Sequence, residues 1–487
     1  MSAAPLRVLF AASEFAPLIK TGGLADVAGA LTAALGELGV DVRVLLPGYG
    51  AVLAGLSNAR RVARLPGVGS FPAAELLEAQ GPHNQRLLAL KCPTLFERDG
   101  GPYVDRDGKD WPDNAVRFGL LSHVAALLSM PATPYDWRCD VLHCNDWQTA
   151  LAPAYHFWRR APHAPCLMTI HNLAYQGVFA RALLQQLALP AESFDVNGVE
   201  YYGNVSFLKA GVLYAKGLTT VSPTYAREIQ TEPLGFGMHG LLAGRRASLE
   251  GILNGIDTAM WDPRSDPALA ATYNAETLER KAINTRALRA QFELEERTGV
   301  PLIGMVTRLV AQKGVDLVVA AAERIARLPA QLVVLGTGEP QIEHALLAAA
   351  ERFKGQIVAR LGFDENLSHL VEAGADMFLM PSRFEPCGLN QLYSQRYGTP
   401  PIARRTGGLA DSVTDCTPQT LADGTATGFL FDDATPEALF EAVARARDVW
   451  QNRTLWNRLQ RNGMARDFSW SASARRYLQL YRALASA

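Results

Sequence analysis

A strand-then-helix pattern recurs along the chain and limits its possible folds more than any other feature. Leu6–Ala12 is a short, largely apolar run, and apolar residues then recur every three or four positions across Leu24–Leu38 until Gly39. The run predicts a strand buried on both faces, and the later spacing predicts a helix. Val40–Leu46 is the next predicted strand. Such alternation predicts parallel sheets with helices on both faces, which bind ligands at the carboxyl ends of their strands.

The same pattern continues to the end of the chain. Further strands are predicted at Cys139–His143, Gly217–Val221, Leu302–Thr307, Leu332–Gly336, Ile357–Leu361, Asp376–Met380 and Pro401–Ala403. Helices are predicted at Trp147–Trp158 and Pro223–Ile229, near Lys313, Glu339, Asn366 and Leu389, from Thr435-Pro436, and at the C-terminus. The last helix has an apolar face that needs a partner to cover it.

One hexapeptide occurs twice. Thr21–Asp26 reads T-G-G-L-A-D and is repeated letter for letter at Thr406–Asp411, each copy following a basic residue, Lys20 or Arg405. Each copy is expected to open a helix, which predicts two similarly built domains with glycine turns facing a shared cleft. The alternative is coincidence between two glycine-rich helix starts. A length of 487 residues allows about three domains or two large ones.

Composition excludes several classes of function. The chain has 47 Lys plus Arg and 48 Asp plus Glu, a net charge of −1, which argues against a nucleic-acid or anionic-lipid surface. Six cysteines without a C-x-x-C pair indicate reduced thiols. The N-terminus does not read as a signal peptide, and no apolar stretch reaches the length of a membrane span. We expect a cytoplasmic protein with no membrane partner.

The first candidate site is Lys20-Thr21-Gly22-Gly23. Glycines allow close backbone approach to a ligand, and free N–H groups at a helix start favour negative charge. The segment therefore reads as a cradle for an anion or sugar phosphate, and the alternative is a structural tight turn. It matches neither the dinucleotide fingerprint nor the P-loop.

Two further candidates follow predicted strands of the second half. Arg308 and Lys313 are cations five residues apart, which suits a diphosphate, although solvated surface cations are the usual alternative. Glu385, in the segment M-P-S-R-F-E-P-C-G-L-N-Q, could accept from sugar hydroxyls or stabilise a cationic transition state. Its alternative is an acid favoured by a helix N-terminus.

Other polar groups are weaker candidates. His171 and Asn172 follow an apolar run, where a histidine is as often structural as catalytic. Cys139, His143 and Cys144 lack the further ligands of a metal site. Asp105-Arg106-Asp107 resembles an acidic metal-binding pair, but the surrounding run favours a solvated turn.

Seven blocks in order resemble the glycogen and starch synthases, which extend α-1,4-glucans from a nucleotide sugar. They are K-T-G-G-L-A-D-V from Lys20, H-C-N-D-W-Q from His143, T-I-H-N-L-A-Y-Q-G from Thr169, G-I-L-N-G-I-D from Gly251, T-R-L-V-A-Q-K-G from Thr307, E-P-C-G-L-N-Q-L-Y from Glu385 and R-T-G-G-L from Arg405.

The resemblance covers nearly the whole chain and implies an α/β protein with two doubly wound, Rossmann-like domains facing a deep cleft, the GT-B fold. It implies an acceptor-binding N-terminal domain at residues 1–250 and a nucleotide-sugar-binding domain at 251–465. Residues 466–487 would form a helix that returns to the N-terminal domain. Retention of configuration, no metal and no cofactor are also implied.

The resemblance also implies roles for individual residues. The implied catalytic residues are His171, Arg308, Lys313, Glu385 and Asp146. Donor or acceptor contacts are implied for Lys20, Gly22, Gly23, Asn254, Phe363, Cys387, Gly388, Leu389, Thr406, Gly407 and Gly408, and for Glu14 and Tyr103 near the acceptor glucan. ADP-glucose is the expected donor, with glycogen or a maltooligosaccharide as acceptor.

The sequence departs from the family pattern at three positions. Gln148 stands where many relatives have His, and Phe363 where they often have Tyr. Tyr393 stands where the wider retaining family has a second Glu, which favours the glycogen synthase branch. The alternatives are a UDP-glucose or other α-glucan glucosyltransferase, a non-catalytic glucan-binding paralogue, and a nucleotide-dependent dehydrogenase, whose fingerprint is missing after the first strand.

Overall fold

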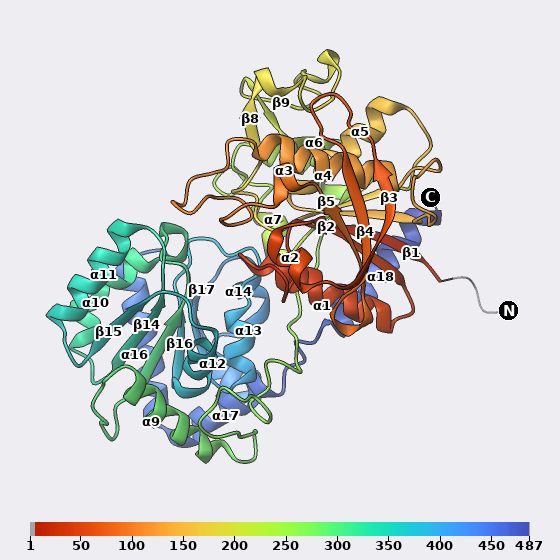
Figure 1. Cartoon of the computed structure of the whole chain (residues 1–487). Coiled ribbons are helices and arrows are strands. Elements are labelled where there is room, and N and C mark those ends of the chain that lie inside the picture. Colours follow the sequence, from red (N-terminus) through yellow and green to blue (C-terminus); the bar gives the residue numbers. More distant parts are fainter. Residues whose placement is uncertain (1–4, 487) are drawn as a thin grey trace. The chain divides into compact units, whose positions relative to one another are not determined.

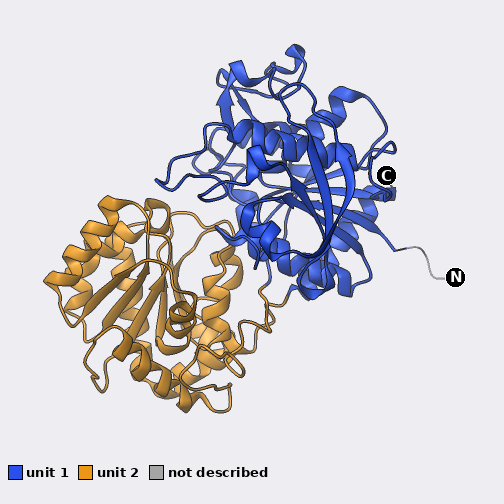
Figure 2. Ribbon diagram, in the orientation of Figure 1, with its two compact units in different colours: residues 1–255, 470–487 blue, residues 256–469 orange. Residues whose placement is uncertain are grey.

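A computed structural model describes residues 5–486 and divides the chain into two compact units. Unit 1 comprises residues 1–255 and 470–487, and unit 2 comprises residues 256–469 (Figure 2). Unit 1 is built around a mixed sheet, in which the three strands at one edge pair antiparallel with one another, and unit 2 around a parallel one; each is described separately below.

Unit 1 contains a nine-stranded sheet in the order β12-β11-β7-β6-β1-β2-β5-β4-β3. Its strands are β1 (Arg7–Ala11), β2 (Asp41–Pro47), β3 (Ser57–Leu65), β4 (Ala74–Gln80), β5 (Arg86–Lys91), β6 (Val141–Asn145), β7 (Cys166–Ile170), β11 (Gly217–Thr220) and β12 (Leu249–Gly251). A separate three-stranded antiparallel sheet contains β8 (Val178–Ala180), β9 (Glu200–Tyr201) and β10 (Asn204–Ser206). The β3–β4 hairpin and this small sheet were not predicted from the sequence.

Helices cover both faces of the main sheet. They are α1 (Gly23–Glu37), α2 (Gly50–Gly55), α3 (Pro93–Phe96), α4 (Asn114–Leu128), α5 (Ala152–Arg159), α6 (Phe207–Tyr214), α7 (Pro223–Glu228), α8 (His239–Gly244) and α18 (Trp470–Ser486). The single helix predicted at Trp147–Trp158 is wrong: a 3-10 turn at Trp147–Thr149 precedes α5. Pro153 in the first turn of α5 explains the new start, because proline is suited to that position.

The terminal helix α18 belongs to unit 1, as the family resemblance implied. It packs against α1 and against strands β6 and β7. Tyr477 and Tyr481 are buried, and the Tyr481 hydroxyl lies 2.8 Å from Nδ1 of His143 in β6. The unit 1 fold therefore depends on the last turns of the chain to cover its central strands.

Unit 2 contains a six-stranded parallel sheet in the order β15-β14-β13-β16-β17-β18. Its strands are β13 (Leu302–Val306), β14 (Gln331–Gly336), β15 (Ile357–Leu361), β16 (Met377–Met380), β17 (Pro401–Arg404) and β18 (Phe429–Phe431). Its helices are α9 (Lys281–Gln291), α10 (Val315–Ala326), α11 (Pro340–Arg352), α12 (Glu365–Gly374), α13 (Asn390–Arg396), α14 (Gly407–Ser412), α15 (Pro418–Ala422), α16 (Pro436–Gln451) and α17 (Arg453–Met464).

Two apolar clusters lie on opposite faces of the unit 2 sheet, whose strands and covering helices are labelled in Figure 1. One joins the sheet to α10, α11, α16 and α17, and the other joins it to α9, α12 and α14. The near-continuous apolar strands of the sequence are explained by this burial on both faces.

Both sheets have the same doubly wound core. In unit 2 the chain steps outward from β13 to β14 and β15 and then returns to the other side of β13 as β16. In unit 1 it passes from β1 to β2 and the outer strands β3, β4 and β5 and then returns beside β1 as β6. These are the points where the strand order reverses, and ligands of doubly wound sheets bind at such points, beyond the carboxyl ends of the strands. The prediction of two Rossmann-like domains is confirmed.

The repeated hexapeptide adopts two different backbone conformations. Helix α1 begins at Gly23 after an extended Gly22 with φ −157°, whereas α14 begins one position earlier, at Gly407, with φ +44°. A Cβ on Gly22 would meet no atom within 4 Å. A Cβ on Gly407 would lie 1.9 Å from the carbonyl oxygen of Glu385. Only the second copy needs glycine for both conformation and close packing.

We expect Gly407→Ala to destabilise the protein by about 3 kcal/mol, because it combines a left-handed φ with a backbone clash. Gly22→Ala, the equivalent change in the first copy, is expected to cost less than about 1 kcal/mol. Thermal unfolding measures both, with an expected midpoint drop of about 5–10 °C for Gly407→Ala. Equal midpoints for the two variants would contradict this account of the repeat.

Among the described residues, no helix combines the length and apolar character needed to cross a bilayer.

Candidate active site

Glu14 follows β1 and organises the first polar loop of unit 1. Its buried carboxylate accepts from the backbone N–H groups of Thr21 at 2.5 Å and Gly22 at 3.1 Å, and from the hydroxyl of Tyr103 at 2.5 Å. The Tyr103 hydroxyl also lies 2.7 Å from that of Ser13. Burial raises the pKa of Glu14, while these hydrogen bonds act in the opposite direction. Glu14 thus connects its own loop to Tyr103, which lies 89 residues further along the chain.

In this structure the backbone amides at the start of α1 already bind an anionic group of the protein itself, the carboxylate of Glu14. The Glu14 carboxylate occupies the amides of Thr21 and Gly22, and Lys20 Nζ lies 2.9 Å from an Asp26 carboxylate oxygen. Anions are favoured at a helix N-terminus by the unsatisfied amides and the helix dipole. A ligand phosphate at these amides would therefore compete with Glu14.

Asp146 follows β6, directly across the strand reversal from Glu14. Its backbone has φ +57° and ψ −177°, a region that is nearly exclusive to glycine, and such strain costs of order 1–3 kcal/mol. The amide of His171 donates to its carboxylate at 3.4 Å, and burial raises its pKa to about 7. A strained, buried carboxyl at this position marks a functional site more strongly than a solvated surface acid.

His171 follows β7, the next strand along the sheet. Its Nε2 lies 3.0 Å from Oδ1 of Asn145, the last residue of β6. The Asn145 amide in turn donates to the Ala11 carbonyl at 3.1 Å, which fixes the orientation of the asparagine. Burial lowers the pKa of His171 to about 3, so the imidazole is neutral near pH 7. Neutral imidazole orients and hydrogen-bonds a ligand without carrying charge.

His143 lies beneath this group rather than within it. Its ring nitrogens are 2.8 Å from the Tyr481 hydroxyl and 2.6 Å from the Thr169 hydroxyl, which continues to Thr219 at 2.5 Å. Burial lowers the pKa of His143 to about 3. This network joins β6, β7, β11 and α18 and keeps His143 from acting as a metal ligand.

Among the described residues of unit 1, the buried side-chain oxygens without a hydrogen-bond partner include Oδ1 of Asn254 and Oε1 of Gln148. Both side chains are more than nine-tenths buried. An unsatisfied buried acceptor costs about 1–3 kcal/mol unless water or a ligand pairs with it. Asn254 was a predicted contact, and Gln148 is the position at which the sequence departs from the D-W-H pattern.

In unit 2, Lys313 and Glu385 form an ion pair beyond the strand reversal. Lys313 follows β13 and Glu385 follows β16, and Nζ lies 2.5 Å from Oε2. The Ser382 hydroxyl donates to the same carboxylate oxygen at 2.9 Å. Both partners are largely shielded from solvent, with exposed side-chain fractions of 18% and 6%. The sequence identified both charged residues but did not predict that they pair with each other.

The loop between Arg308 and Lys313 is held against the β16 loop through its backbone. Gly314 has φ +67°, and a Cβ there would lie 2.1 Å from the carbonyl oxygen of Pro381. Arg383 pairs bidentately with Asp316 at 2.6 Å for each contact. Arg308 itself is exposed at the end of β13. The structure thus fixes Lys313 and presents Arg308 to solvent.

The turn around Cys387 packs onto the second hexapeptide. The amide of Gly408 donates to the Glu385 carbonyl at 3.1 Å, and a Cβ on Gly408 would lie 2.0 Å from the Cys387 carbonyl oxygen. Gly388 has φ +72°, and Gln391 Nε2 donates to both the Cys387 and Gly388 carbonyls at 3.0 Å. Gln391 was missed by sequence reasoning, although it stands in the G-L-N-Q run.

Three predicted residues of unit 2 remain. Thr406 is buried at the N-cap position of α14, and Leu389 precedes α13 and is partly buried. Phe363 follows β15 with 74% of its surface exposed. An exposed aromatic ring at the carboxyl end of a parallel sheet is suited to stacking on a planar ligand group.

Two other features lie outside these groups. The amides of Asp107 and Lys109 donate to the Asp105 carboxylate at 2.9 and 3.0 Å, which makes this acidic segment a turn. Within residues 5–486, no cluster of three or more His, Cys, Asp or Glu side chains has metal-binding geometry.

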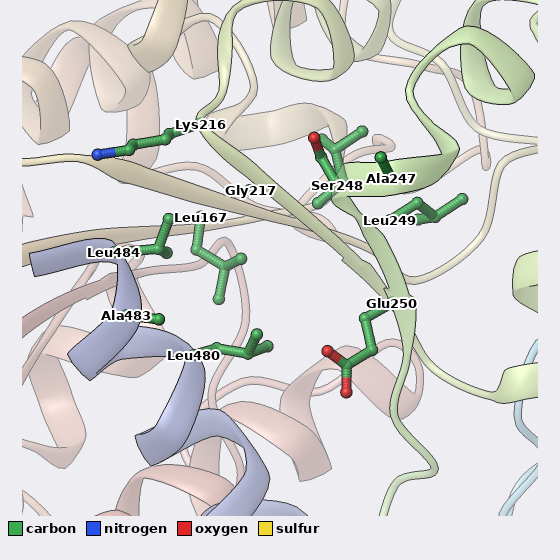
Figure 3. Close-up of a pocket in the computed structure, with 11 residues that line it drawn as sticks. Leu167, Lys216, Gly217, Ala247, Ser248, Leu249, Glu250, Leu480, Ala483 and Leu484 are labelled. Carbon is green, nitrogen blue, oxygen red and sulfur yellow. The ribbon is translucent and has the colours of Figure 1, made fainter. Parts of the chain in front are cut away.

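A surface groove of about 420 Å³ lies far from the strand ends described above. Leu167, Gly217 and Leu249, at the amino-terminal starts of β7, β11 and β12, line it together with the end of α18 (Figure 3). Because it is at the opposite edge of the sheet, it belongs to neither group of predicted residues.

The fold and the polar loops define a class: a two-domain glycosyltransferase with Rossmann-like units of the GT-B type. Residues 7–244 match the family described as starch synthase catalytic domain, and residues 288–463 match glycosyl transferases group 1. The sucrose-phosphate synthase structure from Thermosynechococcus elongatus has a TM-score of 0.59 at 19% identity over 98% of this chain and 99% of that one, which supports the fold alone.

The chain belongs to the glycogen and starch synthase family. It is 53% identical to the glycogen synthase of Nitrosospira multiformis over 98% of this chain and 97% of that protein. Identity to the glycogen synthase of Aromatoleum aromaticum is 55%, covering 100% and 98%. The catalytic domain of starch synthase IV from Arabidopsis thaliana, solved with bound ADP and acarbose, has a TM-score of 0.89 at 33% identity, with 100% of both chains covered.

We expect Asp146 to make stability depend on pH. Its carboxyl ionises near pH 3.8 when unfolded and near pH 7 when folded, so its contribution to stability falls as pH rises between these values. The integrated effect is at most about 4 kcal/mol. Asp146→Asn is therefore expected to narrow the difference between thermal midpoints measured at pH 5 and pH 8.

Glu14→Gln serves as the control, because the pKa of Glu14 is also raised and contributes in the same direction. In that variant the Asp146 contribution should persist. An Asp146→Asn protein with the full wild-type pH dependence would show that the strained carboxyl is not the titrating group.

Proposed function

We propose that this chain elongates an α-1,4-glucan by transferring glucose from ADP-glucose, with retention of configuration, to the non-reducing end of glycogen or a maltooligosaccharide. Similarity to glycogen synthases over nearly the full chain supports the activity. The Lys313–Glu385 pair at the strand reversal of unit 2 is the observation that carries the chemistry. It provides a cation for a diphosphate and a carboxylate for sugar hydroxyls.

We propose that residues 251–465 bind the donor. Arg308 and Lys313 would hold the diphosphate and neutralise the charge that develops on it as the glycosidic bond breaks. Arg308 supplies a planar donor fork and Lys313 a point charge. Glu385 would bind glucose hydroxyls. Arrival of the diphosphate would give Lys313 a second anionic partner while Ser382 continues to hold the carboxylate.

The second hexapeptide and the Cys387 turn would complete the donor site. Thr406, Gly407 and Gly408 would lie along the distal phosphate, and the backbone of Cys387, Gly388 and Leu389 would lie beside the glucose. The glycine-dependent packing of these turns supports this proposal, since it holds both backbones within contact distance. Phe363 would stack on adenine.

We propose that residues 1–250 bind the glucan and the transferred glucose. Asp146 would accept from sugar hydroxyls, and His171, kept neutral by burial, would lie near the anomeric carbon. Lys20, Gly22 and Gly23 would contact the glucosyl phosphate, with Glu14 and Tyr103 near the acceptor and Asn254 at the boundary of unit 1. Residues 466–487 would act by covering the central strands.

The transfer would proceed on one face of the glucose. As the bond to the diphosphate lengthens, the anomeric carbon gains oxocarbenium character and the acceptor 4-hydroxyl attacks from the side of departure. The departing diphosphate would accept the acceptor proton, because His171 is already hydrogen-bonded to Asn145 and Glu385 is already paired with Lys313. No metal or cofactor is required by this scheme. The six buried free thiols are consistent with the proposed cytoplasmic location.

Lys313→Ala and Arg308→Ala are each expected to lower kcat by about 100-fold or more, because each removes charge stabilisation from the leaving diphosphate. Glucose incorporation into glycogen, measured together with nucleotide release, reports the loss. Lys354→Ala is the control, since Lys354 is an exposed lysine of the same unit. Wild-type kcat in both site variants would contradict the proposed roles.

Donor choice is tested by competition between ADP-glucose and UDP-glucose, in which we expect ADP-glucose to be preferred. Preference for UDP-glucose would support the alternative assignment instead.

Phe363→Ala is expected to raise the KM for ADP-glucose about tenfold with a smaller change in kcat, because stacking on a base contributes mainly to binding. Leu347→Ala removes another exposed apolar side chain of unit 2 and should leave KM unchanged.

A further inference from the structure

A short hairpin of unit 1 presents a tyrosine ring to solvent. Strands β9 and β10 pair antiparallel, with Tyr201 opposite Asn204, so Tyr202 and Gly203 form the two-residue turn. Tyr202 is 79% exposed, the highest fraction among the large apolar and aromatic side chains of residues 5–486. Figure 1 places β8 and β9 outside the main sheet. This ring has no part in the site described above.

The backbone at Tyr202 adopts a left-handed conformation, which is unfavourable for tyrosine. Tyr202 has φ +48° and Gly203 has φ +80°. Two-residue turns with positive φ at both central positions favour Asn-Gly, because asparagine tolerates the left-handed region and most side chains do not. Tyrosine at the first central position is therefore unfavourable for the backbone of the turn, and its ring makes an edge-to-face contact with Tyr201 at 4.7 Å between ring centroids.

The hairpin under the ring is rigid. Val199 and Val205 are fully buried, and the Lys209 ammonium donates to the Val196 carbonyl at 2.7 Å and to that of Glu200. Burial lowers the pKa of Lys209. A ring on such a support loses little conformational freedom when a ligand stacks on it.

The hairpin is joined to the segment that follows His171. The Tyr201 hydroxyl donates to the Phe236 carbonyl at 2.7 Å, and Gln176 Nε2 donates to the same oxygen at 2.9 Å. Tyr175, the neighbour of Gln176, is 48% exposed and donates its amide to Asn172. The side chains of Tyr201 and Gln176 thus meet at the Phe236 carbonyl and link the hairpin to the segment that follows His171.

We propose that Tyr202 stacks on the sugar rings of an α-1,4-glucan and forms a surface glucan-binding site distinct from the reacting end of the acceptor. This inference rests on the proposed function, since it requires a glucan substrate. A polymer bound at one end has further rings that meet the protein surface beyond the reaction site. One rigid aromatic face among polar side chains, including Glu200 and Asn204, suits a pyranose, which has apolar C–H faces and hydroxyl edges.

The test uses Tyr202→Asn in the full-length protein, because this change removes the ring while suiting the backbone of the turn. Asparagine relaxes the turn but loses the ring contact with Tyr201, so the thermal midpoint is expected to stay within about 2 °C of the wild type. Retardation in glycogen-containing native gels is expected to show binding weakened about five- to tenfold. Tyr202→Trp, which keeps an aromatic face, should retain binding. Wild-type glycogen affinity in a folded Tyr202→Asn protein would overturn the proposal.

The matched control is Phe157→Ala. Phe157 is 55% exposed in α5 and stacks on Tyr214 at 4.6 Å on a regular helix. It should bind glycogen like the wild type, and an equal loss in this variant would overturn the assignment to Tyr202. Sedimentation velocity adds a further outcome, since loss of an oligomer in Tyr202→Asn without loss of glycogen binding would identify a protein contact instead.

The binding measurement does not depend on turnover. Failure of the proposed function would appear as absence of glucose incorporation by the wild type. Failure of the surface site would appear as unchanged gel retardation in Tyr202→Asn, with incorporation intact.

Discussion

The ion pair between Lys313 and Glu385 is the interaction on which the architecture of unit 2 converges. Taking two charges out of water is costly, and the attraction between them offsets this only when the geometry is good and further hydrogen bonds are present. The Ser382 hydroxyl supplies one such bond, and the glycine turns at Gly314 and Gly407 hold the participating loops in backbone contact. The parallel register of β13 and β16 brings the two loops to the same edge of the sheet.

The buried carboxylates of unit 1 and unit 2 have different kinds of partner. No cation neutralises Glu14 or Asp146 among the hydrogen bonds and ion pairs of the described residues; backbone amides and hydroxyls hold them instead, and both have raised pKa values. Unit 2 places the Lys313 ammonium against Glu385. The two arrangements would suit the proposed partners, since a neutral glucan can be bound by weakly charged acceptors and a diphosphate needs cations.

Much of this arrangement could be predicted from sequence because it depends on local patterns. Buried strands, helix starts and the glycine-rich loops are encoded in short windows, and their alternation predicted parallel sheets; the two doubly wound domains were implied by the family resemblance. Pairing between loops is not local: the contact of Glu14 with Tyr103, or of Lys313 with Glu385, depends on strand register across the sheet. The β9–β10 hairpin escaped prediction because its strands are only two and three residues long.

The conformation of Asp146 was equally invisible in the sequence, since nothing in H-C-N-D-W-Q indicates a positive φ. It has a consequence for the evolution of this enzyme. Asp and Gly codons differ by a single base, so one common mutation relaxes the backbone and removes the carboxyl together. Backbone stability therefore favours glycine at this position, whereas the proposed contact with sugar hydroxyls favours aspartate. Libraries of this protein screened only for thermal resistance would accumulate glycine at position 146 and, with it, lose the carboxyl that the proposed function requires.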